Sequence, residues 1–168
     1  MDFTAHYDSP LGGITMASDG TGLVGLWFDG QKHFAETLEK EHVERPDLPI
    51  FEQTRRWLDL YFNGKQPDFT PPLTLRATPF RKEVWEILLT IPYGKTMTYG
   101  EIAKQIVETH QGTPLQFKSM SAQAVGGAVG HNSISLIIPC HRVVGSHGSL
   151  TGYAAGLDKK LWLLKMER

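Results

Sequence analysis

One cysteine lies in a sequence context that could make it reactive. Cys140 is the single cysteine of the 168-residue chain and belongs to the stretch LIIPCHRVVG, residues 136–145. Many cysteines are small buried hydrophobic residues, and the apolar run 134–138 fits that interpretation. His141 and Arg142 follow directly, however, and a neighbouring cation lowers the pKa of a thiol toward that of a reactive thiolate. The local sequence therefore leaves two interpretations open, a packing residue and a nucleophile.

A nucleophilic thiol needs a base, and the base often has a third group that orients it. His141 is the obvious base, because it is next to the cysteine. Acidic residues are scarce in this part of the chain, where only Asp158 and Glu167 follow Glu108, so either of these two could be the orienting group. One cysteine beside one histidine, with no second pair at ligand spacing, does not build a zinc site. We therefore expect no metal and no cofactor.

Charge is distributed unevenly along the chain, although the net charge is only −1. Residues 1–74 carry six basic and twelve acidic side chains, whereas residues 75–168 carry eleven and six. A basic half suggests an anionic partner such as nucleic acid, and the alternative is that both halves are simply solvated. A lone cysteine favours a reducing compartment, so we expect a cytoplasmic protein. The sequence has no run of 18 apolar residues and no apolar segment near its start, so we expect no membrane association.

The first part of the sequence has the pattern of a small sheet with one helix. Residues 12–18 alternate between apolar and polar side chains, a DGTG turn follows, and residues 23–28 are mostly apolar, which predicts a β-hairpin. Residues 51–62 carry apolar side chains on one helical face, which predicts a helix. Asn63 and Gly64 are typical of its end.

The proline-rich stretch 64–77 is expected to separate an N-terminal α/β lobe, residues 1–74, from a second lobe, residues 75–168. Thr78 and Pro79 are typical of the N-cap and the first position of a helix. The predicted elements of the second lobe are helices over 80–91, 98–106, 119–132 and 156–168, and a strand over 133–139.

Three stretches of the second lobe resemble the O6-alkylguanine-DNA alkyltransferases, also called methylated-DNA–protein-cysteine methyltransferases. They are TPFRKEVWEILLTIPYGKTMTYGEIA, QAVGGAVGHN and IPCHRVVGSHGSLTGYAAGLDKKLWLLKMER, which together cover most of residues 78–168. The first lobe matches this family only in size and strand pattern. The resemblance implies a small N-terminal α/β lobe, made of a short antiparallel sheet and a helix, followed by a mainly helical, winged-helix-like DNA-binding lobe.

The resemblance also implies a role for each matching residue. Cys140 would accept the alkyl group of O6-alkylguanine, with O4-alkylthymine as a second candidate substrate, and each molecule would act once. His141 would take the thiol proton through a water, Glu167 would orient the imidazole, and Asn132 would hold the active-site turn. Tyr99 would assist nucleotide rotation and donate a hydrogen bond to the guanine. The implied guanine pocket also contains Val143, Gly152, Tyr153 and Ala154, and the implied DNA contacts are Ser121, Gln123, Ala124, Gly126, Gly127, Ala128 and Arg142. The expected partner is double-stranded DNA containing alkylated guanine, bound by a monomer.

The sequence departs from the family pattern at two places that concern DNA. Gln123 stands where the family usually has arginine, and glutamine lacks the charge and the planar fork of that side chain. The segment 106–120 is longer than expected between two such helices; it enlarges the DNA contact, recognises another partner, or is a tolerated surface insertion.

Two other functions are compatible with parts of the pattern. A non-enzymatic lesion-binding relative of these enzymes typically lacks the cysteine, so Cys140 argues against it. A cysteine hydrolase would use Cys140, His141 and Asn132 as a triad. Such triads come from distant segments, whereas these residues lie close together in the sequence.

Overall fold

The computed structural model describes residues 1–110 and 122–168 and divides the chain into two compact units. The first unit contains Met1–Arg76 and Ser133–Ile137, and the second contains Ala77–Asn132 and Ile138–Arg168. Each unit is therefore discontinuous in sequence, unlike the two continuous lobes that we expected. Within the described ranges, no helix is both long and apolar enough to cross a membrane.

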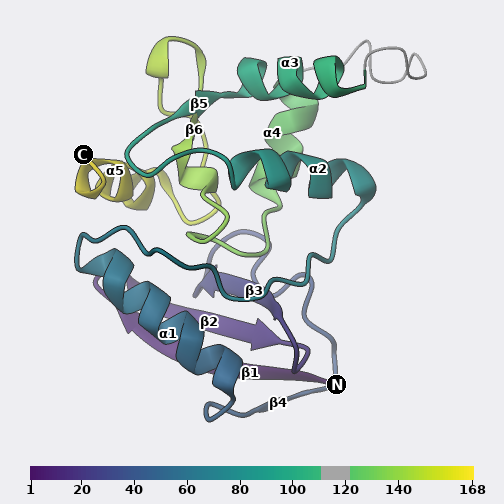
Figure 1. Cartoon of the computed structure of the whole chain (residues 1–168), viewed down its shortest axis with the longest axis vertical. Helices are drawn as coiled ribbons and strands as arrows, with labels where there is room; N and C mark the ends of the chain where they lie inside the picture. Colours follow the sequence, from purple (N-terminus) through teal and green to yellow (C-terminus); the bar gives the residue numbers. More distant parts are fainter. Residues whose placement is uncertain (111–121) are drawn as a thin grey trace. The chain divides into compact units, whose positions relative to one another are not determined.

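The first unit is built on a four-stranded sheet in the order β3-β2-β1-β4 (Figure 1). Strands β1, β2 and β3 pair antiparallel, which confirms the predicted hairpin, and β4 adds to β1 in parallel. Their bounds are Asp2–Ser9 for β1, Gly12–Ser18 for β2, Leu23–Phe28 for β3 and His42–Glu44 for β4. The sequence gives no signal for β4, because its three side chains are all exposed.

Helix α1, Pro49–Phe62, packs against β1 and β2. It begins two residues before the predicted start, because Pro49 occupies the first turn, where a missing amide hydrogen costs nothing. Gly64 follows with a φ of 76°, a backbone conformation that favours glycine and ends the helix as predicted. The helix and the sheet enclose a core that includes Ala5, Ile14, Met16, Leu26, Phe28, Phe51, Leu58 and Tyr61.

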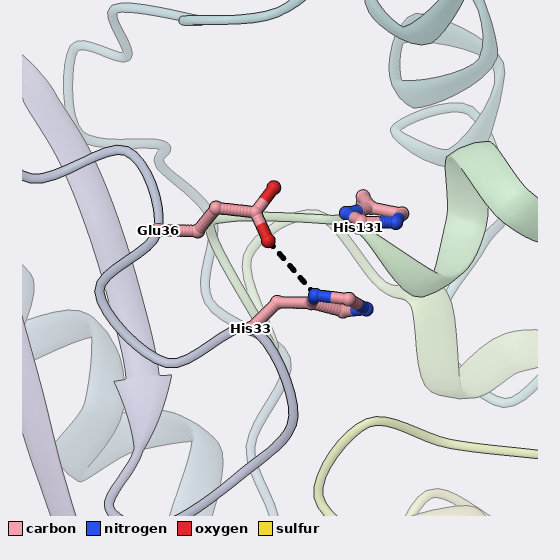
Figure 2. Close-up of side chains that lie close together, drawn as sticks. All are labelled: His33, Glu36 and His131. Carbon is pink, nitrogen blue, oxygen red and sulfur yellow. Dashed lines mark ion pairs between the residues drawn. The ribbon is translucent and has the colours of Figure 1, made fainter.

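The loop after β3 contains an ion pair between His33 and Glu36, whose Nδ1 and Oε2 atoms are 2.8 Å apart (Figure 2). Both side chains are substantially exposed. A pair with this spacing and exposure contributes little to stability, and we assign it to the local conformation of the loop.

Among its described residues, the second unit has four α-helices, one of which begins with the predicted capping box. In α3, Tyr99–Thr109, the Thr98 side chain accepts from the Glu101 amide and the Glu101 side chain accepts from the Thr98 amide. The other helices are α2, Pro79–Leu88, α4, Ala122–Gly130, and α5, Leu157–Met166. Helices α2 and α4 are joined by a hydrogen bond of 2.9 Å from Trp85 Nε1 to the carbonyl oxygen of Ala128.

Two short strands of the second unit bring distant segments together. Strand β5, Met97–Thr98, pairs in parallel with β6, Val143–Val144, so the start of α3 lies beside the segment that follows Cys140. Helix α2 ends three residues before the predicted end. We attribute this to Pro92, because a proline disfavours the helical conformation of the residue before it.

The predicted strand over 133–139 is wrong. Residues 135–137 form a turn, and Leu136 has a φ of 71°. Only Ile134 forms an isolated bridge, with Leu26, and the Ser135 amide donates to the Leu26 carbonyl at 2.8 Å. Leu136 and Ile138 are nevertheless buried, so the apolar run reflects burial and not an extended backbone.

Candidate active site

Cys140 lies at the start of a short 3₁₀ turn, η2, Cys140–Arg142, directly after Pro139. The carbonyl oxygen of Ile138 accepts two hydrogen bonds of 2.8 Å, from the Cys140 amide and from Nδ2 of Asn132. Asn132 thereby fixes the backbone just before the cysteine. Only 5% of Cys140 is exposed. The turn thus presents a thiol that is held in place and largely protected from water.

The surroundings of the thiol favour its protonated form at rest. Burial raises the pKa of Cys140, against smaller opposing effects of a hydrogen bond with Asn132 and the positive charge of Lys160. The hydroxyl of Tyr153, which is buried although the residue as a whole is half-buried, also interacts with the thiol, and burial and the cysteine raise the pKa of Tyr153. The expectation of a lowered thiol pKa is therefore wrong, because burial outweighs the effect of nearby cations. Such a thiol needs a base to become a nucleophile.

His141 is placed to serve as that base. Its Nε2 atom lies 2.7 Å from Oε2 of Glu167, and both side chains are almost fully buried. Burial lowers the pKa of His141, which the nearby carboxylate opposes, so the imidazole is neutral at neutral pH. Because a carboxylate accepts hydrogen bonds, Nε2 carries the hydrogen and Nδ1 is left as the basic nitrogen.

Glu167 is itself fixed by Arg142. The guanidinium donates from Nε to Oε1 at 2.8 Å and from Nη2 to Oε2 at 3.1 Å, and its Nη1 donates to the carbonyl oxygen of Ile91 at 2.9 Å. The expectation that Arg142 contacts DNA is therefore wrong. Its three nitrogen atoms are engaged inside the second unit, and the residue is only 8% exposed.

Gly94 supports the same carboxylate from the loop between α2 and β5. Its amide donates to Oε1 of Glu167 at 3.1 Å. The φ of Gly94 is 78°, and a Cβ at this position would lie 2.9 Å from the carbonyl oxygen of Glu167. This position therefore requires glycine, both for its backbone conformation and for the close approach.

Lys160, on α5, is a charged residue of the site that sequence reasoning missed. Its side chain is fully buried, and Nζ donates to the carbonyl oxygens of Val143 at 2.6 Å, Gly152 at 3.3 Å and Thr151 at 3.4 Å. One ammonium group thus joins the strand after Cys140 to the loop that leads to Tyr153. Burial lowers the pKa of Lys160, and the negative charge of the thiolate opposes this effect. Three carbonyl partners nevertheless favour its charged form.

Tyr99, the first residue of α3, reaches the same loop. Its hydroxyl oxygen and Oγ1 of Thr151 lie 2.9 Å apart and share a hydrogen bond. Its ring lies 3.8 Å from the point where a Cβ of Gly126 would be, which is an ordinary van der Waals distance, so the ring packs against α4 at this glycine.

Comparison with known proteins agrees with this geometry along the whole chain. Residues 79–168 match the model of the 6-O-methylguanine DNA methyltransferase DNA-binding domain, and residues 3–75 match that of the ribonuclease-like domain of the same enzymes. The chain belongs to the O6-methylguanine-DNA methyltransferase family.

Individual relatives cover nearly all of the chain. A methylated-DNA–protein-cysteine methyltransferase of Mycobacterium tuberculosis is 42% identical over 97% of this chain and 92% of its own length. One of Methanosarcina acetivorans is 41% identical over 98% and 97%. Among solved structures, the M. tuberculosis OGT in complex with DNA is 41% identical, with a TM-score of 0.82 over 99% of this chain and 91% of that chain. The mixed α/β architecture predicted from the sequence is thereby confirmed.

The residues that a methyltransferase of this family would turn toward DNA are only partly exposed here. In α4, Gln123, Ala124 and Gly127 are exposed, and Gly126 is half-buried. Ala128 is 3% exposed, and its carbonyl is bonded to Trp85, so the expectation that it contacts DNA is wrong. Ser121 lies outside the described residues, as does most of the long segment 106–120.

The predicted pocket residues lie in two settings. Val143 is buried, and its carbonyl is bonded to Lys160. Gly152 is exposed, whereas Tyr153 and Ala154 are half-buried, so this part of the loop can be reached by a ligand. The spacing of residues in the sequence does not indicate that Lys160 binds backbone carbonyls or that Arg142 binds Glu167. From the sequence alone, Lys160 in the LDKKLW stretch would be predicted to be a solvent-exposed charge, because the sequence does not show its carbonyl partners.

Proposed function

We propose that this protein repairs double-stranded DNA by transferring an alkyl group from O6-alkylguanine to Cys140, once per molecule. Membership of the methyltransferase family supports the reaction class. The hydrogen-bonded series Glu167–His141, next to a buried thiol that is fixed by Asn132, is the observation that carries the assignment of the residues.

The reaction begins with loss of the thiol proton. Nδ1 of His141 takes it through a bridging water, and Glu167 stabilises the imidazolium that forms. The thiolate then attacks the alkyl carbon, the bond from that carbon to O6 breaks, and guanine leaves with the electron pair of that bond. The departing guanine takes up one proton from water, the imidazolium gives back to water the proton that came from the thiol, and the sulfur is left as a thioether. Cys140 is the only cysteine, so no second thiol can reverse this step.

The target base must leave the duplex to reach a thiol that is 5% exposed. Extrusion costs a few kcal/mol of lost stacking and pairing. The small exposed residues of α4, Ala124 and Gly127, suit close approach to a narrow groove, and we propose that Gln123, which is also exposed, fills the gap left in the stack. We propose that O4-alkylthymine is a second substrate, and that the protein acts as a monomer in the cytoplasm.

The decisive experiment is intact-mass measurement after incubation with duplex DNA that contains one O6-methylguanine. The wild-type protein should gain one methyl group and the DNA should lose it. Cys140→Ser should bind the duplex without any change in mass. Tight binding by the wild type without transfer would instead indicate a lesion-binding protein, and neither binding nor transfer would contradict the proposed function.

A further inference from the structure

We propose that Arg142 is a positioning residue for alkyl transfer, which keeps His141 neutral at rest by compensating the charge of Glu167. The inference rests on the proposed function, because it concerns the base of that reaction and its readiness to take a proton. It also gives a role inside the active site to an arginine that we expected to contact DNA.

Hydrogen-bond donors surround the carboxylate of Glu167. Its Oε1 accepts from Nε of Arg142 at 2.8 Å and from the amide of Gly94 at 3.1 Å. Its Oε2 accepts from Nη2 of Arg142 at 3.1 Å and from Nε2 of His141 at 2.7 Å. An ionised carboxylate has about four lone-pair positions, and these four donors fill them. A proton on Glu167 would have to displace one of the donors, so the carboxylate stays ionised and the imidazole keeps its hydrogen on Nε2.

The charges of the buried groups determine whether the imidazole is also protonated on Nδ1. A buried carboxylate alone would favour the charged imidazolium beside it. Arg142 opposes this, because it is only 8% exposed and bonds to both carboxylate oxygens of Glu167. Lys160 is a second buried cation. Among the described residues of the second unit, the buried charges at rest are thus one negative and two positive, and a proton on His141 would add a third positive charge.

Ionisation of the thiol changes this balance. At rest, burial lowers the pKa of His141, Glu167 opposes this effect, and the charges of Arg142 and Lys160 lower that pKa further. The thiolate of Cys140 adds a negative charge next to the imidazole, so a proton on Nδ1 is then compensated. The imidazole can therefore accept a proton when the cysteine gives one up. Arg142 thus makes protonation of the base depend on ionisation of the nucleophile.

Arg142 is held in this place by two further contacts. Its Nη1 donates to the carbonyl oxygen of Ile91 at 2.9 Å, and its guanidinium carbon lies 5.6 Å from the centroid of the Tyr93 ring. A cation over the face of an aromatic ring is attracted to it. A lysine in this position would keep the charge but not the planar fork, so charge and hydrogen-bond geometry can be separated by substitution.

The test reads the protonation state of His141 in the resting protein by ¹⁵N NMR of the ring nitrogens, assigned by comparison with His141→Gln. At pH 7 the wild-type ring should be neutral, with its hydrogen on Nε2. Arg142→Met removes the charge, so the ring should be protonated at pH 7. Transfer to Cys140 should then be about tenfold slower at pH 7 and recover at higher pH, because a protonated imidazole cannot act as the base.

Three further variants separate charge from shape and from folding. Arg142→Gln also removes the charge but keeps a donor for the carboxylate, and it should give a protonated ring even if Arg142→Met does not fold. Arg142→Lys keeps the charge and should leave the ring neutral. When Arg142→Met is combined with Glu167→Gln, neither charge is present, and the ring should again be neutral at pH 7.

The matched control is Arg76→Met. Arg76 holds the buried carboxylate of Asp2 with two similar bonds in the first unit, so its loss should change neither the ring nor the transfer rate. Thermal unfolding reports the folded fraction of each variant, since breaking a buried pair is destabilising. An imidazolium in the resting wild type, or a neutral ring in folded Arg142→Gln, would overturn the inference. Both outcomes are observed without DNA, whereas failure of the wild type to transfer would overturn the proposed function.

Discussion

Each unit of the protein buries a carboxylate that an arginine holds with two hydrogen bonds. In the first unit, Arg76 donates to the two oxygens of Asp2 at 2.6 and 2.8 Å. In the second unit, Arg142 donates to the two oxygens of Glu167 at 2.8 and 3.1 Å. Both carboxylate side chains are 1% exposed. The two pairs therefore have similar hydrogen-bond geometry and similarly buried carboxylates, and the arginine does not account for a difference in their roles.

The two pairs differ in their third partner. Asp2 accepts in addition from the amide of Glu39, and Arg76 donates to the carbonyl of Thr37, so this pair joins β1 to the loop between β3 and β4 and to the linker. Glu167 has a titratable partner, His141, next to the nucleophile. The same bidentate pair serves as a structural anchor in one unit and as part of a proton path in the other. A buried ion pair thus becomes functional through the group beside it.

Replacing each carboxylate by its amide should affect the transfer rate much more at Glu167 than at Asp2. Glu167→Gln removes the charge that stabilises the imidazolium, and we expect the transfer rate to fall about a hundredfold, as is typical when general-base catalysis is impaired. Time courses of methyl transfer by intact mass would measure the effect. The matched variant Asp2→Asn should keep the wild-type rate. Equal rates for the two amides would show that Glu167, like Asp2, is only an anchor.

Asp2→Asn should instead change stability. Removing one partner of a buried pair leaves the other uncompensated, and because Arg76 is partly exposed we expect a loss of about 2 kcal/mol in the free energy of unfolding. The hydrogen bond from Arg76 lowers the pKa of Asp2 below its usual 3.8. Its stabilising effect is therefore complete above that value and is lost as the pH falls through the lowered pKa. Denaturant unfolding between pH 7 and 2 should show a steeper acid loss for the wild type than for the variant.

Lys160→Met tests another buried charge, whose ammonium group donates to three backbone carbonyls. The positive charge of Lys160 lowers the thiol pKa against the effect of burial, so its removal should raise that pKa further. We expect transfer at pH 7 to slow about tenfold, because a smaller fraction of the thiol is ionised, with the rate recovering at higher pH. Alkylation of the native thiol by iodoacetamide across pH would report the same shift. Lys65→Met, at an exposed lysine of the first unit, should leave both profiles unchanged.

Gln123→Arg should change the transfer rate least, because Gln123 lies on the exposed face of α4 and contacts none of the buried charges discussed above. Arginine adds charge and a planar fork, so extrusion of the base should become easier by about 1 kcal/mol or less. We expect a rise of a few-fold in the repair rate of duplex DNA and little change for single strands. Equal acceleration of both substrates would reject an effect on extrusion.

The sequence predicts those parts of the fold and site that depend on local signals. The capping box at Thr98 and the stop at Gly64 were predicted correctly, because caps are local. Strand β4 was missed, since its exposed side chains carry no periodicity. The apolar run before Cys140 was taken for a strand, because burial and extension give the same pattern over a few residues. Arg142 was assigned to DNA, since a cation in a sequence does not reveal a carboxylate 25 positions away.

Because the chain has a single cysteine, the state of that thiol shows whether a given molecule has already reacted. Cys140 is the only thiol in the chain, and it is buried in the folded protein. After unfolding, a thiol-reactive dye can therefore label only molecules that have not yet reacted. If the proposed function holds, the unlabelled fraction of a purified pool equals the number of lesions removed per protein, and the protein serves as a built-in counter of DNA alkylation.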